Sequence, residues 1–152
     1  MVARNLKSFL DEQAVKYLTI QHSQAFTTQE VAASAHVPGS KIAKTVIVAV
    51  GPDLVMVVVP GSRMVSLETV AAAVGRKDVR IAREQEFRLL FPGSELGAMP
   101  PFGNLYGMDV YVDPALTQDV EIAFNAGSHT ELIRMLYADF ERLVQPKVLA
   151  TA

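Results

Sequence analysis

A lysine at the entrance of a very apolar segment is the first residue of this sequence with a clear chemical possibility. Lys44 lies just before the apolar run at 46–50, and in a strand its side chain shares a face with Ile42 and Val46. An ammonium group there either extends to water while its stem packs, or meets a negatively charged group. A compact ammonium suits a substrate phosphate or carbonyl. Lys44 is therefore a candidate substrate contact, with a strand-end packing lysine as the alternative.

The segment 92–107, PGSELGAMPPFGNLYG, is a second candidate. Its four glycines and three prolines exclude a helix or a central strand. Long loops of this kind in compact domains are usually functional or disordered, and the apolar side chains at Met99, Phe102 and Tyr106 argue against disorder. Glycines allow a backbone to approach a ligand closely and to direct N–H groups at an oxyanion. A packed Ω-loop without a ligand is the competing interpretation.

The three histidines are scattered and contain no i,i+4 pair, so a zinc site is not indicated. His36 lies near an expected helix C-terminus, where a structural role is favoured. His22 and His129 each lie at the end of an expected strand, from which either side chain can reach a cleft.

Other familiar catalytic patterns are missing. The Gly-Ser pairs lack the Gly-x-Ser-x-Gly elbow of a serine nucleophile, the acidic residues show no paired spacing, and the chain has no cysteine. One basic cluster lies at 76–88, where interspersed acidic residues favour a solvated face; it is also a possible source of phosphate contacts beside Lys41 and Lys44.

The bulk composition predicts an ordinary globular domain. The chain has 152 residues, a net charge of −2, half of its residues hydrophobic and a fifth charged. This length favours one domain, and the small net charge gives no global attraction to nucleic acid. No stretch approaches a membrane span and the N-terminus lacks an apolar signal region, so we expect a cytoplasmic protein.

The strongest secondary-structure signal is a hairpin. The segments 41–50 and 54–60 are β-branched runs separated by Gly51-Pro52-Asp53, which predicts an antiparallel pair in which Lys44 lies opposite Pro60. Both runs are apolar on both faces, so the hairpin should be central in its sheet.

Helices and further strands surround this hairpin. We expect helices near 6–13, 27–37, 67–74, 83–91 and 138–145, with Thr27 and Ser66 as N-caps and Gly75 as a C-terminal glycine. Strands are expected at 16–22, 78–82, 109–113, 120–127 and 129–137. Runs of strands with interspersed helices indicate an α+β domain with a mixed, mainly antiparallel sheet.

Taken together, these segments resemble the YbaK/ProX-type aminoacyl-tRNA deacylases, a family that includes the editing insertion domain of bacterial prolyl-tRNA synthetases. The resemblance covers about residues 20–145. Its most specific part is HSQAFTTQEVAASAHVPGSKIAKTVIV at 22–48; LGAMPPFG at 96–103 resembles the Gly-x-x-Pro-x-Gly loop of the family, and FNAGSHTELIRMLYADFERLVQP at 124–146 its closing strand-helix unit.

The resemblance implies a barrel-like sheet flanked by helices, a single editing domain over 1–152, and hydrolysis of mischarged aminoacyl-tRNA in trans, without a cofactor or metal. The substrate's terminal ribose hydroxyl would help to orient the attacking water. It also implies binding to the acceptor end of tRNA, while a synthetase partner and the oligomeric state stay open. The site residues that it implies are catalytic Lys44, Gly97 and His129, with substrate contacts from His22, Phe26, Thr45, Ala98, Met99, Gly127 and Ser128.

Two other interpretations remain. A pocket of this kind can bind an aminoacyl or nucleotide group without turnover. A Schiff-base enzyme using Lys44 is weakly supported, because no aromatic or acidic residues cluster beside this lysine.

Overall fold

The structure is a computed structural model that describes residues 6–22, 30 and 37–149. The helix expected at 27–37, with its cap Thr27, and the substrate contact Phe26 lie outside the described residues, apart from Glu30 and Val37.

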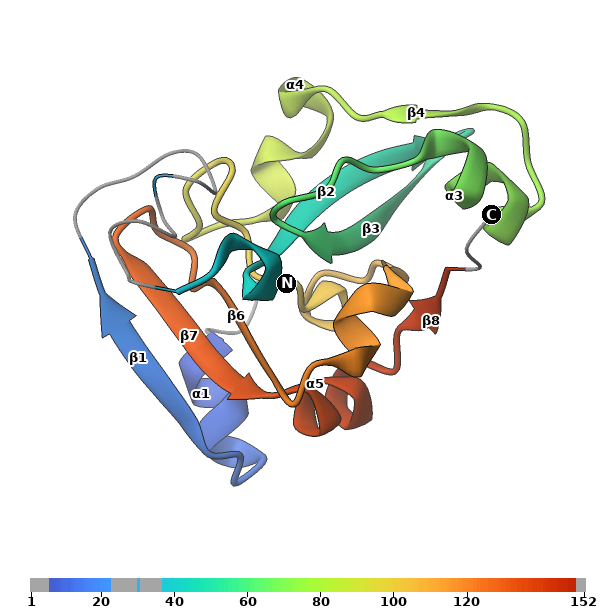
Figure 1. Ribbon diagram of the computed structural model, residues 1–152. Helices are drawn as coiled ribbons and strands as arrows, with labels where there is room; N and C mark the ends of the chain where they lie inside the picture. Colours follow the sequence, from blue (N-terminus) through green and yellow to red (C-terminus); the bar gives the residue numbers. More distant parts are fainter. Residues whose placement is uncertain (1–5, 23–29, 31–36, 150–152) are drawn as a thin grey trace.

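The predicted hairpin forms the centre of the larger sheet (Figure 1). Strand β2 (Ala43–Val50) pairs antiparallel with β3 (Asp53–Pro60). The predicted register is wrong by one residue: Val50 pairs with Asp53, and Lys44 lies opposite Val59 rather than Pro60. The turn contains only Gly51 and Pro52, with Gly51 at φ +58°, a conformation that a two-residue hairpin turn favours for glycine. Asp53 therefore joins the strand.

The larger sheet has the order β4-β2-β3-β5-β8, with β4 at Val79–Ile81, β5 at Val110–Val112 and β8 at Lys147–Val148. Pairing is antiparallel for β4–β2 and parallel for β3–β5 and β5–β8. The hairpin is thus central, as expected. The two-residue strand β8 was not predicted, because so short a segment has no periodicity of its own.

A separate three-stranded sheet has the order β1-β7-β6, formed by β1 (Tyr17–Gln21), β7 (Glu131–Leu136) and β6 (Glu121–Asn125), all antiparallel. A single parallel bridge, Ile42↔Ala123, joins it to the chain entering β2. Among the described residues, this bridge is the strand pairing that joins the two sheets.

Four described helices flank the sheets: α1 (Leu6–Glu12), α3 (Leu67–Val74), α4 (Glu84–Phe87) and α5 (Tyr137–Val144). Ser66 caps α3 by accepting the Thr69 N–H at 3.2 Å, and Gly75 ends it at φ +72°, both as predicted. Short 3-10 turns η1 (Gly39–Lys41), η2 (Arg88–Leu90), η3 (Gly103–Leu105) and η4 (Pro114–Gln118) connect these elements.

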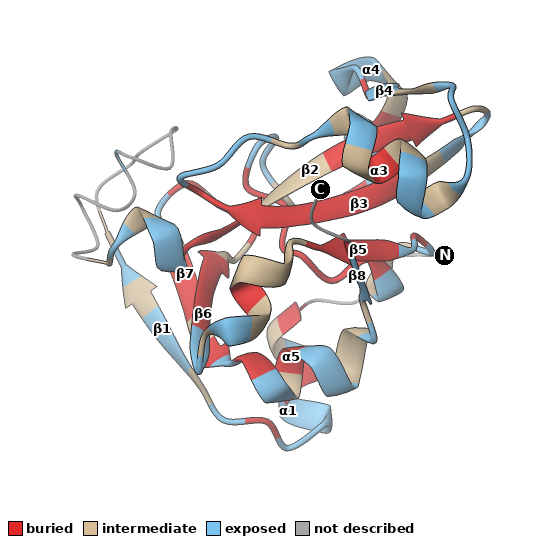
Figure 2. Ribbon diagram, turned by 45° about the vertical axis from the view of Figure 1, so that its right-hand side comes forward, coloured by how far each residue is buried: buried red, intermediate tan, exposed pale blue. Residues whose placement is uncertain are grey.

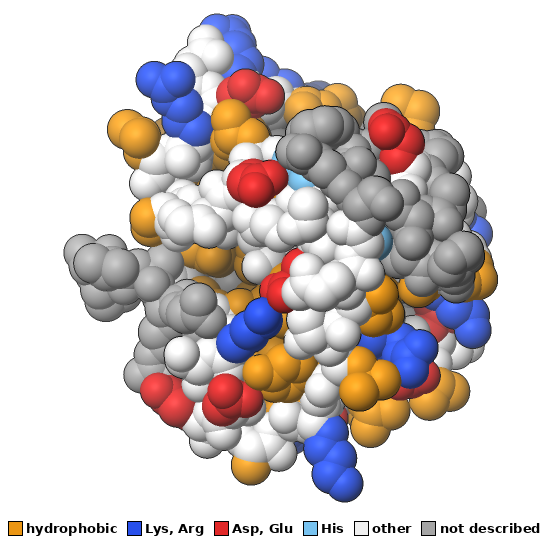
Figure 3. Space-filling model, turned by 90° about the vertical axis from the view of Figure 1, so that its left-hand side faces the viewer, with side chains coloured by type: hydrophobic (Ala, Val, Ile, Leu, Met, Phe, Trp, Pro, Cys, Tyr) orange, Lys and Arg blue, Asp and Glu red, His pale blue; other side chains and the backbone are white. Residues whose placement is uncertain are grey.

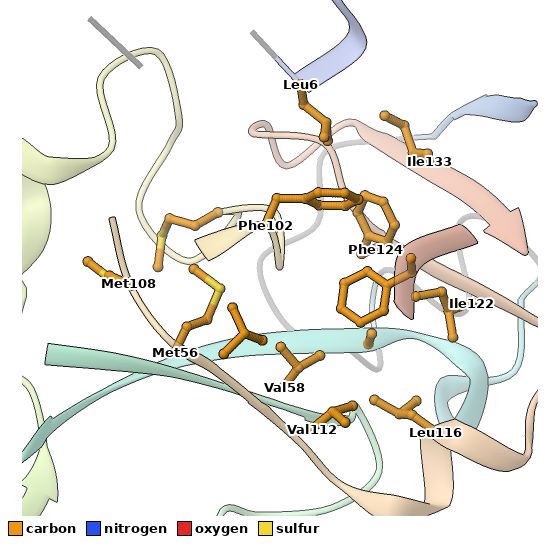
Figure 4. Packing of buried hydrophobic residues seen from close by; sticks show 14 of the residues in the cluster. Leu6, Met56, Val58, Phe102, Met108, Val112, Leu116, Ile122, Phe124 and Ile133 are labelled. Carbon is orange, nitrogen blue, oxygen red and sulfur yellow. The ribbon is translucent and has the colours of Figure 1, made fainter. Parts of the chain in front are cut away.

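Apolar layers cover both faces of β2 and β3, and most residues of the two strands are buried (Figure 2). One layer packs Val48, Val57 and Tyr111 under Val70 of α3. The main core lies between the two sheets, where Phe102 from the glycine-rich segment packs beside Phe124 of β6 at a ring distance of 5.5 Å, next to Met56 and Val58 of β3 (Figure 4). The segment 92–107 is therefore anchored in the core by its own side chains.

The α+β class with antiparallel and mixed sheets flanked by helices is confirmed. The described strands form two sheets and do not close into a barrel. Closure would need continuous pairing between β2 and β6, where the structure has only the Ile42↔Ala123 bridge.

Candidate functional site

The glycine-rich segment docks against the turn that joins β6 and β7. The Glu95 N–H donates to the Gly127 carbonyl at 2.7 Å, and the Gly127 N–H donates to the Ala98 carbonyl at 3.0 Å. Gly127 has φ +99°, and a Cβ there would lie 3.3 Å from Ser94 Oγ, so this close approach requires glycine. The two segments form one rigid unit although they are about thirty residues apart in sequence.

His129 is held at the centre of this unit. It is only 7% exposed, and its Nε2 lies 2.8 Å from the Leu96 carbonyl oxygen. A carbonyl can only accept, so Nε2 carries the proton and the ring is held in one tautomer. Glu95 accepts the backbone N–H of His129 at 3.2 Å, and its carboxylate lies 3.7 Å from Nε2. The imidazole is thereby oriented by Leu96 and Glu95 together.

Gly97 lies directly beside this imidazole. Its φ is +83°, and a Cβ built there would meet His129 Cε1 at 3.5 Å. Its N–H donates to the Met99 thioether sulfur at 3.3 Å, a weak acceptor. The neighbouring Ala98 N–H is already bound to the Glu95 carbonyl at 3.0 Å. An incoming oxyanion would therefore replace the weak thioether acceptor of the Gly97 N–H at a smaller cost in free energy than the carbonyl acceptor of the Ala98 N–H.

Lys44 is half-buried on β2, and within the described residues its ammonium has no ion pair. It lies two residues beyond Ile42, as Asn125 lies two residues beyond Ala123. The Ile42↔Ala123 bridge is isolated, so Lys44 and Asn125 each lie two residues beyond the junction of the two sheets. Asn125 Oδ1 is buried and has no hydrogen-bond partner in the described part of the chain. Lys44 and Asn125 therefore supply a donor and an acceptor at the junction of the two sheets.

The remaining predicted site residues lie in two places, at the β6–β7 turn and on β2. His22 lies next to the β6–β7 turn, since its N–H donates to the Thr130 carbonyl at 2.9 Å. Ser128 belongs to this turn, and its hydroxyl lies 3.2 Å from the Thr130 hydroxyl. Thr45 follows Lys44 in β2, so its side chain lies on the opposite face of the strand, and its buried hydroxyl has no hydrogen-bond partner among the described residues. The structure does not bring Thr45 and Lys44 to one face.

Sequence reasoning missed two residues, Glu95 and Asn125. Glu95 is a single acidic residue in a loop, and its contact with His129 spans 34 positions. Asn125 is the last residue of β6 (EIAFN) and resembles a turn residue. No local pattern distinguishes either of them.

The basic cluster at 76–88 is largely neutralised by its own acidic neighbours. Arg76 forms a two-pronged contact with Asp78 at 2.8 and 2.7 Å, and Arg80 does the same with Glu86 at 2.7 and 3.0 Å. The Arg80 guanidinium and the Arg83 N–H lower the pKa of Glu86 to about 2. On the face shown in Figure 3, cationic and acidic side chains are likewise interspersed with hydrophobic ones. We interpret the cluster as a solvated face.

Three further observations bear on the chemistry. Among the described residues, no group of three or more His, Asp or Glu side chains could hold a metal ion. No helix in this part of the chain is long and apolar enough to cross a membrane. Burial raises the pKa of Tyr106, in the same loop as Gly97, while a hydrogen bond to Ser94 opposes this shift.

A glycine loop and a turn hold one histidine in place, and Lys44 on β2 has no ion pair among the described residues. These groups are suited to an anionic or carbonyl ligand. The family model of the aminoacyl-tRNA editing domain matches residues 22–143. The chain belongs to the aminoacyl-tRNA editing domain family.

Solved structures agree on the fold. A proposed trans-editing enzyme for prolyl tRNA synthetase is 21% identical, with a TM-score of 0.82, covering 99% of this chain and 97% of that chain. The hypothetical protein APE2540 is 22% identical, with a TM-score of 0.84, covering 95% of this chain and 97% of that chain. No curated protein matches the chain in sequence.

Proposed function

We propose that this chain is a single editing domain that deacylates mischarged aminoacyl-tRNA in trans. Membership of the editing-domain family supports tRNA editing as the role. The observation that carries the hydrolytic proposal is the Gly97 N–H, which donates only to a thioether beside the oriented imidazole of His129.

The reaction needs little from the protein beyond positioning. An aminoacyl ester is already activated, so a water oxygen can attack the carbonyl carbon, after which the ester C–O bond breaks and the ribose oxygen leaves with a proton. The neighbouring ribose hydroxyl of the substrate would orient that water. In this proposal the Gly97 N–H stabilises the oxyanion, and Lys44 holds the terminal phosphate or ribose.

The other predicted residues would surround this ester. His129, which is held by its contacts with Glu95 and Leu96, would position the acyl group or the water. Ala98, Met99, Gly127 and Ser128 belong to the same docked unit and would form its walls, with His22 beside the turn. Phe26 is a further proposed substrate contact and Asn125 is an addition, whereas Thr45 lies on the opposite face of β2 from Lys44 and is not included.

The proposed function is tested by a deacylation screen across a panel of mischarged tRNAs, with and without EDTA. We expect hydrolysis of at least one mischarged tRNA at a rate unchanged by the chelator, because the proposed oxyanion donor is a backbone N–H. Activity lost in EDTA and restored by zinc would contradict this mechanism. Binding without turnover of any tRNA would identify a non-catalytic module instead.

His129→Ala should lower the single-turnover deacylation rate moderately, by about tenfold, the loss of one hydrogen-bonded positioning group. His22→Ala should have a smaller effect, since the backbone hydrogen bond of His22 to the Thr130 carbonyl survives the substitution. Rates of both variants are compared at equal folded fraction, established by thermal melts. A larger loss for His22→Ala than for His129→Ala would reverse the proposed ranking.

A further inference from the structure

Two turns of nearly identical sequence lie at the open end of the central hairpin. The first is Pro-Gly-Ser-Lys at 38–41 and the second is Pro-Gly-Ser-Arg at 60–63. The same hydrogen bond closes both turns: the N–H of the basic residue donates to the carbonyl of the proline, at 2.9 Å in each. Each turn therefore presents a serine followed by a basic residue on the same backbone arrangement.

The hairpin places the two turns next to each other and close to Lys44. The Gly61 N–H donates to the Ile42 carbonyl at 2.7 Å, which joins the second turn to the residue that follows the first. Lys44 lies two residues further along β2, opposite Val59, which immediately precedes the second turn. Because neighbouring strands lie about 4.8 Å apart, both turns lie close to the strand end that carries Lys44.

The polar side chains of the turns are open to solvent. The serine and the basic residue of each turn are exposed: Ser40, Lys41, Ser62 and Arg63. In the described part of the chain neither serine hydroxyl has a hydrogen bond, and Lys41 has no ion pair. A Cβ built at Gly39 would meet nothing within 4 Å, so a ligand can approach the backbone of the first turn closely. Serine hydroxyls with Lys or Arg side chains are among the groups with which proteins bind phosphate oxygens.

The acidic residues near the turns leave both cations able to bind an anion. Asp113 Oδ1 lies 3.5 Å from Arg63 Nη1 and also caps η4. The Arg63 side chain is 57% exposed, so the other donors of its guanidinium stay available. Lys41 lines a pocket together with Asp119 and Glu121, and within the described residues it forms an ion pair with neither.

We propose that the two turns bind backbone phosphates of the tRNA acceptor end and so lead its terminal nucleotide to Lys44. Ser40 and Lys41 hold one phosphate, and Ser62 and Arg63 hold another. Phosphate contacts fix the position of a nucleic acid without reading its sequence, so the turns position the acceptor end and do not select among tRNAs. This inference rests on the proposed function, because it takes the terminal adenosine to be held at Lys44.

The test measures the dissociation constant of uncharged tRNA at several salt concentrations. Lys41→Ala and Arg63→Ala should each weaken binding about tenfold at low salt, as expected for one charge-assisted contact. Each should also lower the slope of log affinity against log salt by about 0.7, the value for one phosphate of a single strand. The matched controls are Lys77→Ala, at an exposed lysine outside the turns, and Arg142→Ala on α5, whose side chain is also 57% exposed and pairs with Asp139 at 3.3 Å. Neither control should change the affinity or the slope.

A third variant should strengthen binding, which damage to the fold would not do. Asp113→Asn removes the carboxylate beside Arg63 and keeps a side-chain oxygen that can cap η4. It should tighten tRNA binding by about two- to fivefold, the range for releasing one exposed ion pair, whereas Asp139→Asn beside Arg142 should not.

Equal losses for the turn variants and their controls, an unchanged salt slope, or equal effects of the two Asp→Asn variants would overturn the inference. Uncharged tRNA carries no ester, so failure of this binding test is distinct from failure to deacylate tRNA.

Discussion

Lys44→Ala is expected to keep the melting temperature of the protein and to lose most of its deacylase activity. The lysine is half-buried and, in the described structure, has no ion pair, so truncation removes mainly the packing of its stem. A charge-assisted contact to phosphate or ribose contributes about 1.5–3 kcal/mol, or roughly ten- to a hundredfold in rate. The measurements are a thermal melt and a single-turnover deacylation rate.

Two further variants sharpen this result. Lys44→Arg should restore little activity, because a planar guanidinium does not replace a compact ammonium. Lys77→Ala removes an equal charge from a solvated face and should leave the rate unchanged. A large fall in melting temperature with a normal rate for Lys44→Ala would make this lysine structural, and would remove the main link between the β2 entrance and catalysis.

Gly97→Val is expected to lower the deacylation rate by about a hundredfold, the range seen when an oxyanion donor is lost. A side chain at φ +83° is strained, and it would meet His129 Cε1 at 3.5 Å from its Cβ alone. The substitution therefore strains the backbone that carries the Gly97 N–H and places a side chain in van der Waals contact with the imidazole. Rates are measured in single turnover, with the fold checked by NMR.

Gly93→Val is the matched control within the same loop. Gly93 has the same φ of +83°, but a Cβ there would meet nothing within 4 Å. Both variants carry similar backbone strain, so the difference between them isolates the neighbourhood of His129. If both lose activity equally, loop strain explains the result; if neither does, the loop serves only as packing.

The sequence by itself determined most of the described elements and their order. The β-branched runs around Gly51-Pro52 specified a central hairpin, and Ser66 and Gly75 specified the ends of α3. These features depend on local periodicity and backbone preference, which adjacent residues carry. The sequence also identified Lys44, Gly97 and His129 as the candidates, through their unusual settings and the family resemblance.

Tertiary structure decided how those candidates are related. The register of the hairpin depends on a turn of two residues, Gly51 and Pro52. The junction of the two sheets depends on the Ile42↔Ala123 bridge. The orientation of His129 depends on contacts with Glu95 and Leu96, which lie more than thirty positions away in the sequence. Contacts over such separations arise from the packing of the whole core around Phe102, and no local sequence pattern encodes them.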